Sequence, residues 1–150
     1  MADQVAVEVL PVVGKMEIEN EIIEAEKITS AAIHVHVSTR FFEQDTERNT
    51  LRLFHRLHMN RTHERNSVLI YINPKRKKFS IYGDKGAHEK LGDAYWQDLV
   101  KHLREKISEH QVTQGLVLTV KKLGQDLAAH FPRTDKNPIQ TYNLTSEGKN

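Results

Sequence analysis

The sequence predicts an α/β fold, a three-layer α/β/α sandwich in which helices cover both sides of a small central mixed β-sheet. The first observation is a succession of strand, helix and strand, at residues 31–38, 46–60 and 68–73. Such a unit normally joins two parallel strands through a crossover helix. The second observation is a turn at residues 74–77 that leads into another β-rich run at 79–82, as in a hairpin of antiparallel strands. Parallel and antiparallel pairs together make the predicted sheet mixed.

Length and composition limit the class of protein. The chain has 150 residues, 38% of them hydrophobic and 28% charged, which fits one globular domain. It contains no cysteine, which excludes thiolate nucleophiles and thiolate zinc sites. The formal net charge of +2 argues against nucleic acid as a partner. Because no apolar run approaches the roughly 20 residues that span a bilayer, and no signal peptide is evident, we expect a soluble, cytoplasmic protein without membrane insertion.

The first elements follow from helical spacing and from alternation. Residues 1–14 are expected to form an N-terminal arm, either an edge strand or a loosely attached segment. Residues 16–27 combine acidic, helix-favouring residues with a modest apolar stripe, which predicts an amphipathic helix. In the strand at 31–38, β-branched side chains alternate with small or polar ones, so we expect one strand face to meet a helix layer. The β-branched residues are Ile33, Val35 and Val37.

The elements in the centre of the chain are predicted from the same patterns. The helix predicted at 46–60 carries apolar residues at helical spacing, and the run at 68–73 is almost wholly apolar, which is typical of a buried strand. The turn between the hairpin strands contains Lys75, Arg76, Lys77 and Lys78. Although such a cluster resembles a phosphate-binding or targeting patch, a hairpin turn is naturally solvated, and we interpret it as a charged turn.

Two long helices are predicted in the second half. The first follows Gly92, with Asp93 as its cap, and places its large apolar residues on one face. The second begins near Thr113 and is stopped by Pro132. Gly124 lies on the apolar stripe of that helix, where a glycine costs about 1 kcal/mol relative to alanine, so we expect it to serve close packing against a neighbouring element.

The predicted organisation is an N-terminal arm at 1–14, a domain at 15–132 and a polar C-terminal tail at 133–150. The tail contains Pro138 and no apolar period. It is expected either to be disordered or to wrap back over the domain.

The segment Gly83-Asp-Lys-Gly86 is the main candidate site. It leaves a strand and opens a helix, so backbone N–H groups at Gly86, Ala87 and His88 could face an anion, and Asp84 could hold a cation. The alternative is a structural turn in which Asp84 caps the helix and glycine permits the bend. Arg65 and Asn66 are expected to hydrogen-bond the loop that enters the neighbouring strand, beside this site.

Histidine pairs suggest a second kind of site. His34 and His36 share one strand face, and His55 and His58 are neighbours on the predicted helix, a geometry that permits zinc binding. Nothing in the sequence brings the two pairs together, and no His-Glu-x-x-His motif is present. Polar, solvent-facing or hydrogen-bonded histidines are therefore the favoured interpretation.

The order of motifs along residues 15–137 resembles the TPM domain family, known from bacterial proteins and from a thylakoid-lumen protein linked to photosystem II repair. Each motif alone is weak, but their order is specific. The motifs are Thr29-Ser30, Met59-Asn-Arg-Thr62, Arg65-Asn66 with Val68-Leu-Ile-Tyr71, Lys78-Phe79, Gly83-Asp-Lys-Gly86 with His88-Glu-Lys90, Tyr95-Trp96, Gly115-Leu-Val117, and Gly124 through His130-Phe-Pro132.

The resemblance implies an α/β fold with helices on both sides of a small sheet. For members of the family, divalent-cation binding, weak acid phosphatase activity and maintenance of membrane complexes have been proposed. This chain departs from the family pattern, with Thr29-Ser-Ala-Ala32 where relatives tend to have Thr-Ser-Gly-Glu, and with Arg76 and Lys77 where relatives often have an acidic hairpin turn. The later carboxylates of the family's acidic C-terminal segment are also missing.

Two functions remain open from the sequence. We favour a non-catalytic TPM-like module that binds a still unknown protein partner, with a divalent cation, calcium or magnesium, held weakly by Asp84 together with Asp135 or Asn137 if the tail folds back. The alternative is a weak metal-assisted acid phosphatase in which Asp84 holds the ion, Lys85 binds phosphate and His88 protonates the leaving group.

Overall fold

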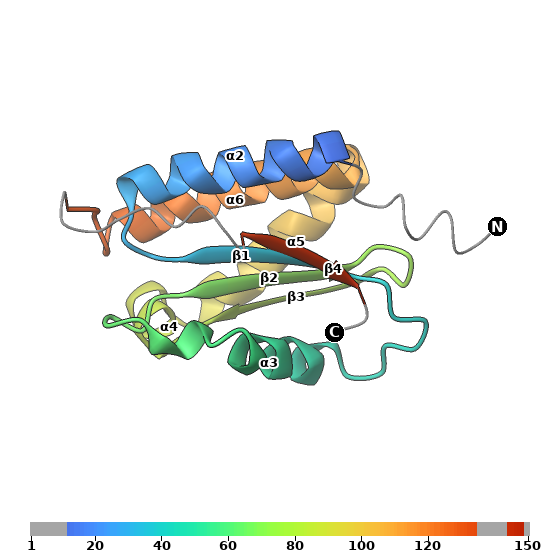
Figure 1. Cartoon of the computed structure of the whole chain (residues 1–150), viewed down its shortest axis with the longest axis horizontal. Helices are drawn as coiled ribbons and strands as arrows, with labels where there is room; N and C mark the ends of the chain where they lie inside the picture. Colours follow the sequence, from blue (N-terminus) through green and yellow to red (C-terminus); the bar gives the residue numbers. More distant parts are fainter. Residues whose placement is uncertain (1–11, 135–143, 149–150) are drawn as a thin grey trace.

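The computed structural model describes residues 12–134 and 144–148 of the chain. A long N-terminal helix is followed by a strand, a helix, a hairpin, further helices and a last short strand (Figure 1). The elements are α2 (Val12–Ile28), β1 (Ile33–Ser38), α3 (Thr46–Arg56), a 3₁₀ turn η1 (Met59–Arg61), β2 (Val68–Asn73), β3 (Lys78–Gly83), α4 (Lys85–Leu91), α5 (Asp93–Glu109), α6 (Val112–Ala128) and β4 (Thr145–Gly148).

The sheet is mixed, with the strand order β3-β2-β1-β4. β1 runs parallel to β2, with Ile33 opposite Val68, and parallel to β4, with Val35 opposite Thr145. β2 and β3 form an antiparallel hairpin. The carboxyl ends of β1, β2 and β4 therefore share one edge of the sheet, which we call the carboxyl edge. β3 ends at the opposite edge, the amino edge, where β1 and β2 begin.

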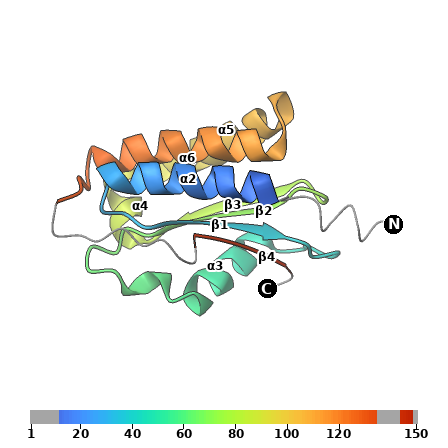
Figure 2. The same ribbon diagram turned by 45° about the horizontal axis from the view of Figure 1, so that its top comes forward.

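Helices cover both faces of this sheet. Figures 1 and 2 show α2, α5 and α6 together on one side and α3 on the other. The predicted three-layer α/β/α sandwich with a small mixed sheet is thus confirmed. No helix among the described residues is long and apolar enough to cross a lipid bilayer.

Side chains of the central strands alternate between two apolar cores. Ile33, Val35 and Val37 of β1 enter the larger core, as their alternation predicts. β2 supplies that core with Val68, Ile70 and Ile72, and the smaller core on the α3 side with Leu69 and Tyr71.

Gly124 permits the close contact between α2 and α6. A Cβ atom at this position would lie 2.6 Å from the Cβ of Ala25, closer than real side chains approach. The prediction that this glycine serves close packing is confirmed. Gly83 has the same role at the end of β3, where a Cβ would lie 2.5 Å from the ring of Trp96.

Several element boundaries differ from the prediction. The first helix begins at Val12 rather than at residue 16, and α3 ends at Arg56 because His58 adopts a left-handed conformation, with φ of 59°. The cap of α5 is Gly92, not Asp93. Gly92 has a φ of 88°, a region open to glycine, and this places the chain at the start of α5 without a side-chain cap.

The C-terminal segment contributes a strand that the sequence pattern does not indicate. Of the predicted tail at 133–150, residues 145–148 form β4 beside β1, so this part wraps back onto the domain. Ser146 on β4 meets both strand histidines, with its Oγ 2.9 Å from Nε2 of His34 and 2.7 Å from Nδ1 of His36. Nε2 of His36 lies 3.3 Å from the carbonyl oxygen of Gly148, which can only accept, so this nitrogen carries the proton.

Acid is expected to weaken the folded state through His36. Burial lowers the pKa of this imidazole from 6.5 to about 4, and the neighbouring His34, Arg40 and Glu43 also affect it. Below pH 6.5 the unfolded chain gains a proton that folded His36 does not take up, so the unfolding free energy falls as the pH drops from 6.5 toward 4. Glu26 has the opposite effect on stability. Burial raises its pKa from 4.5 to about 7, so its contribution to the unfolding free energy falls as the pH rises from 4.5 to about 7.

Comparison of the wild type with His36→Gln separates the two groups. Denaturant unfolding at about pH 7 and about pH 5 should show a smaller stability difference between the proteins at the lower pH, because only the wild type loses the His36 contribution. An equal loss in both proteins would assign the acid sensitivity to other groups.

Candidate functional site

The segment Gly83–Gly86 lies at the amino edge of the sheet. Gly83 is opposite Val68 in the antiparallel hairpin, so the loop stands beside the beginning of β2. The ligand position common in α/β proteins is at the carboxyl ends of parallel strands, which here is the opposite edge. Because β3 runs antiparallel to β2, the loop that follows β3 lies at the amino edge and not at this common ligand position.

Asp84 is enclosed by hydrogen-bond donors. Its side chain is 1% exposed, and its Oδ1 accepts from the backbone N–H of Lys85 at 2.9 Å, which caps α4. The guanidinium of Arg65 donates from Nε to Oδ2 at 2.5 Å and from the terminal nitrogen to Oδ1 at 2.9 Å. This hydrogen bond raises the pKa of Arg65 above its usual value. Both carboxylate oxygens are thus held by a two-pronged contact with a fixed positive charge.

The backbone amides at the start of α4 are occupied as well. The N–H groups of Gly86 and Ala87 point to the carbonyl oxygen of Arg65, at 2.8 and 3.3 Å, and that of His88 donates to the carbonyl of Asp84 at 2.8 Å. No side chain fits at Gly86, since a Cβ there would lie 2.2 Å from the carbonyl oxygen of Glu64. The arrangement is that of a structural clamp between two loops.

The other predicted site residues lie around this clamp. Asn66 donates to the hydroxyl of Ser30 and to the carboxylate of Glu64, both at 3.2 Å, and so joins the loops that precede β1 and β2. The side chain of Lys85 is exposed to solvent. Asp135 and Asn137, the further cation ligands predicted from the sequence, lie outside the described residues.

His88 is turned toward α5 rather than toward Asp84. Its Nε2 lies 2.5 Å from a carboxylate oxygen of Asp93, and its ring is stacked on that of Trp96 with 6.2 Å between the ring centres. To protonate a phosphate bound at the loop, His88 would have to leave its contacts with both Asp93 and Trp96.

Within residues 12–134 and 144–148, no three or more histidines, aspartates and glutamates gather in a way that could hold a metal ion. His34 and His36 share a strand face as predicted and meet Ser146, whereas His58 lies beyond the end of α3 and is not a helical neighbour of His55.

Sequence reasoning missed a buried carboxylate at the carboxyl edge. Glu43, in the loop after β1, is 7% exposed. It accepts hydrogen bonds from Tyr71 at 3.0 Å, from Asn73 at 2.9 Å and from Ser38 at 3.3 Å, and a further one from Asn49. The sequence does contain a signal that points to this buried carboxylate: the polar residues Ser38 and Asn73 at the ends of two apolar strands.

The loop that Glu43 anchors carries an exposed aromatic pair. Phe41 is 61% exposed and Phe42 74%, and their rings meet edge to face. Arg76, from the β2–β3 turn, stacks on Phe41 at 4.3 Å and donates from Nε to the carbonyl oxygen of Phe41 at 2.6 Å. Together with the exposed basic turn they form one surface, which we call the aromatic–basic edge. It consists of Phe41, Phe42, Lys75, Arg76, Lys77 and Lys78.

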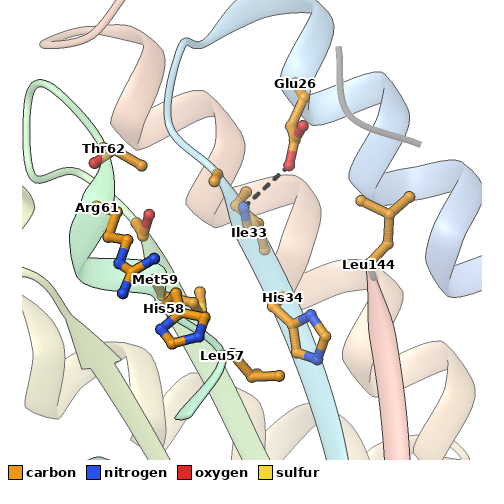
Figure 3. Close-up of a pocket in the computed structure, with 11 residues that line it drawn as sticks. Glu26, Ile33, His34, Leu57, His58, Met59, Arg61, Thr62 and Leu144 are labelled. Carbon is orange, nitrogen blue, oxygen red and sulfur yellow. Dashed lines mark hydrogen bonds between the residues drawn. The ribbon is translucent and has the colours of Figure 1, made fainter. Parts of the chain in front are cut away.

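A pocket of about 280 Å³ also opens at the amino edge, and its lining residue Ser67 accepts, through its carbonyl oxygen, from the backbone N–H of Asp84 at 2.9 Å. Figure 3 shows Glu26 and His34 on one side of it, from α2 and β1, and His58 and Arg61 on the other, from the η1 segment. We call it the amino-edge pocket. Its lining is mixed, and Ser67, at the start of β2, belongs to it.

Removal of the charge at Asp84 should reduce stability. In Asp84→Asn the neutral amide replaces an acceptor of charge-assisted hydrogen bonds, and we expect the unfolding free energy to fall by roughly 1–3 kcal/mol in denaturant titrations. Asp98→Asn, an exposed carboxylate on α5, is the matched control. Equal stability of the two variants would contradict a structural role of the Arg65–Asp84 contact.

Comparisons with known proteins agree with the architecture. The TPM domain matches the sequence over residues 5–126. The fold is similar to the NMR structure of the BA42 protein from the psychrophilic bacterium Bizionia argentinensis, with a TM-score of 0.83 and 33% sequence identity over 93% of this chain and 95% of that one. A search among curated proteins finds no match. The family match covers most of the chain and the structural match nearly all of it, so this protein belongs to the TPM domain family.

Proposed function

We propose that this TPM domain is a non-catalytic interaction module that docks an acidic segment of a protein partner on its aromatic–basic edge. The observation that carries the proposal is the pair of exposed phenylalanines beside a basic turn. Exposed large apolar side chains gathered at one place commonly mark interaction sites in water-soluble domains.

The chemistry of the surface indicates what kind of partner fits. Aromatic and arginine side chains supply much of the binding energy at protein interfaces. Phe42 offers an open ring, while Lys75, Lys77 and Lys78 add exposed positive charge around it. Positive charge attracts a negatively charged segment and raises its association rate. An acidic segment with an apolar side chain between its carboxylates would match both features.

The surface is also held in place before binding. Glu43 ties the loop to β2 through Tyr71 and Asn73, and Arg76 ties Phe41 to the hairpin turn. A preorganised surface loses less conformational entropy when a partner binds. This rigidity supports a recognition role for the loop.

The clamp at Asp84 supports the non-catalytic part of the proposal. A phosphatase mechanism at this loop requires an open carboxylate for the metal and open amides for phosphate. The guanidinium of Arg65 donates to both carboxylate oxygens of Asp84, and the carbonyl oxygen of Arg65 accepts from the N–H groups of Gly86 and Ala87. A calcium or magnesium ion at Asp84 would have to displace the guanidinium, which is consistent with weak binding at most.

Docking can be tested with a synthetic peptide of alternating glutamate and leucine, followed by nuclear magnetic resonance. We expect shifts at residues 40–42 and 75–78, and weaker binding as salt is added. Phe42→Ser should reduce the affinity about tenfold, the effect of losing roughly 1.4 kcal/mol. Lys75→Glu with Lys77→Glu should also weaken binding, whereas Lys101→Glu on α5 should not. A peptide with glutamine in place of glutamate is the control for charge.

Equal binding of the glutamine peptide, or shifts away from this edge, would contradict docking. If Phe42→Ser bound the peptide as tightly as the wild type, the aromatic pair would not be part of the docking surface.

Cation binding and phosphatase activity are tested separately. Thermal melting with calcium or magnesium should shift the wild type little, because Arg65 competes for Asp84, and a shift of several degrees that Asp84→Asn removes would support a cation at the loop. Turnover of an aryl phosphate that Asp84→Asn abolishes would overturn the non-catalytic assignment.

A further inference from the structure

We propose that the amino-edge pocket binds a small organic carboxylate, whose charged end meets Arg61 and Ser67 and whose short apolar part lies against the aliphatic wall. This site is at the opposite edge of the sheet from the aromatic–basic edge, and it does not depend on the docking of a protein partner.

The first observation is an unused polar group in the pocket wall. Ser67 is 1% exposed, and its Oγ has no hydrogen-bond partner among the described residues. Buried hydroxyls are nearly always hydrogen-bonded, so an unpartnered one calls for an explanation. A turn about χ1 to another staggered position redirects this hydroxyl. It would then donate to a ligand oxygen placed in the pocket.

The second observation is the balance of charge around the pocket. Arg61 is exposed at one side, and the imidazoles of His34 and His58 stand on either side (Figure 3). A planar guanidinium binds a carboxylate through two parallel hydrogen bonds. The positive guanidinium of Arg61 would repel an ammonium ligand, so an anion fits the pocket better than a cation.

Glu26 also lines the pocket, where an ionised carboxylate would repel an anion. It is almost fully buried, and Oε2 accepts from the backbone N–H of Ile33 at 3.0 Å. Burial raises its pKa to about 7, and Arg133 partly offsets this effect. Below that pH the side chain is mostly the neutral acid, which can donate a hydrogen bond to a carboxylate. The charged groups that face Glu26 are Arg133 and, across the pocket, Arg61, and the titratable imidazoles of His34 and His58 also line the pocket.

The third observation is the size and the apolar part of the pocket. A volume of 280 Å³ corresponds to about nine water molecules at roughly 30 Å³ each. Leu57, Met59 and Leu144 contribute to the wall. This combination suits a carboxylate with a short aliphatic chain better than inorganic phosphate, which has no apolar part.

Butyrate is a suitable probe, with butyramide as its uncharged counterpart and inorganic phosphate as a purely polar anion. In amide-proton titrations of the full chain at about pH 6, butyrate should shift residues 58–62 and 67. Butyramide and phosphate should bind at least tenfold more weakly. Equal shifts with butyramide, or shifts that fall elsewhere, would overturn the proposal.

Variants test the named groups. Arg61→Gln, at an exposed position, should weaken butyrate binding at least tenfold, whereas Arg56→Gln on α3 should leave it unchanged. Ser67→Ala should fold normally, because the lost hydroxyl has no partner among the described residues, and should bind butyrate more weakly. Unchanged affinity in Arg61→Gln would overturn the assignment of the carboxylate to this side of the pocket.

The pH dependence provides an independent readout. Binding should weaken between about pH 6 and about pH 8 as Glu26 loses its proton. Glu26→Gln can still accept from Ile33 and donate to the ligand, so its affinity should change less over that range. A wild type and Glu26→Gln that lose affinity in parallel would exclude Glu26 from the site.

Discussion

The complete burial of β2 is the constraint on which the rest of the structure depends. Every residue from Val68 to Asn73 is buried, between two neighbouring strands and two helix layers. Burial of its large apolar side chains contributes roughly 1.5–3 kcal/mol each and holds the layers together. Such a strand leaves no room for unpaired polar groups, so the chain must provide partners where the strand enters and leaves the core. Among the described residues, one polar cluster lies at each of these two points.

The two clusters solve the same problem with different consequences for function. At the entrance to β2, Arg65 and Asp84 neutralise one another and leave the loop closed. At its exit, Glu43 accepts from the neutral side chains of Tyr71, Asn73 and their neighbours. These contacts fix a loop whose aromatic side chains stay in solvent. Asp84, which the sequence pattern singles out as a candidate ligand, therefore joins two loops, while Glu43, in an ordinary loop, positions the exposed surface.

The layers were predictable because they depend on periodic burial. The run at 68–73 has the same bounds in the sequence pattern and in the structure, since nearly all its residues are apolar. β4 was missed because Thr-Ser-Glu-Gly has no apolar period, and its pairing depends on backbone bonds and on Ser146. Asp84 was identified as a cap or ligand from its place between strand and helix. Its partner, Arg65, lies 19 residues away, and no local pattern indicates that the two side chains meet. The amino-edge pocket was also missed because its walls come from distant segments.

The late position of β4 in the chain has a consequence for the order of synthesis. Ser146 lies 110 residues beyond His36, its partner on β1. A ribosome adds roughly 5–20 residues each second, so β1 emerges about 5–20 s before β4. During that interval the edge of β1 has no strand beside it, and unpaired strand edges can join other chains. The late closure of this edge therefore leaves β1 open to pairing with other chains for that time.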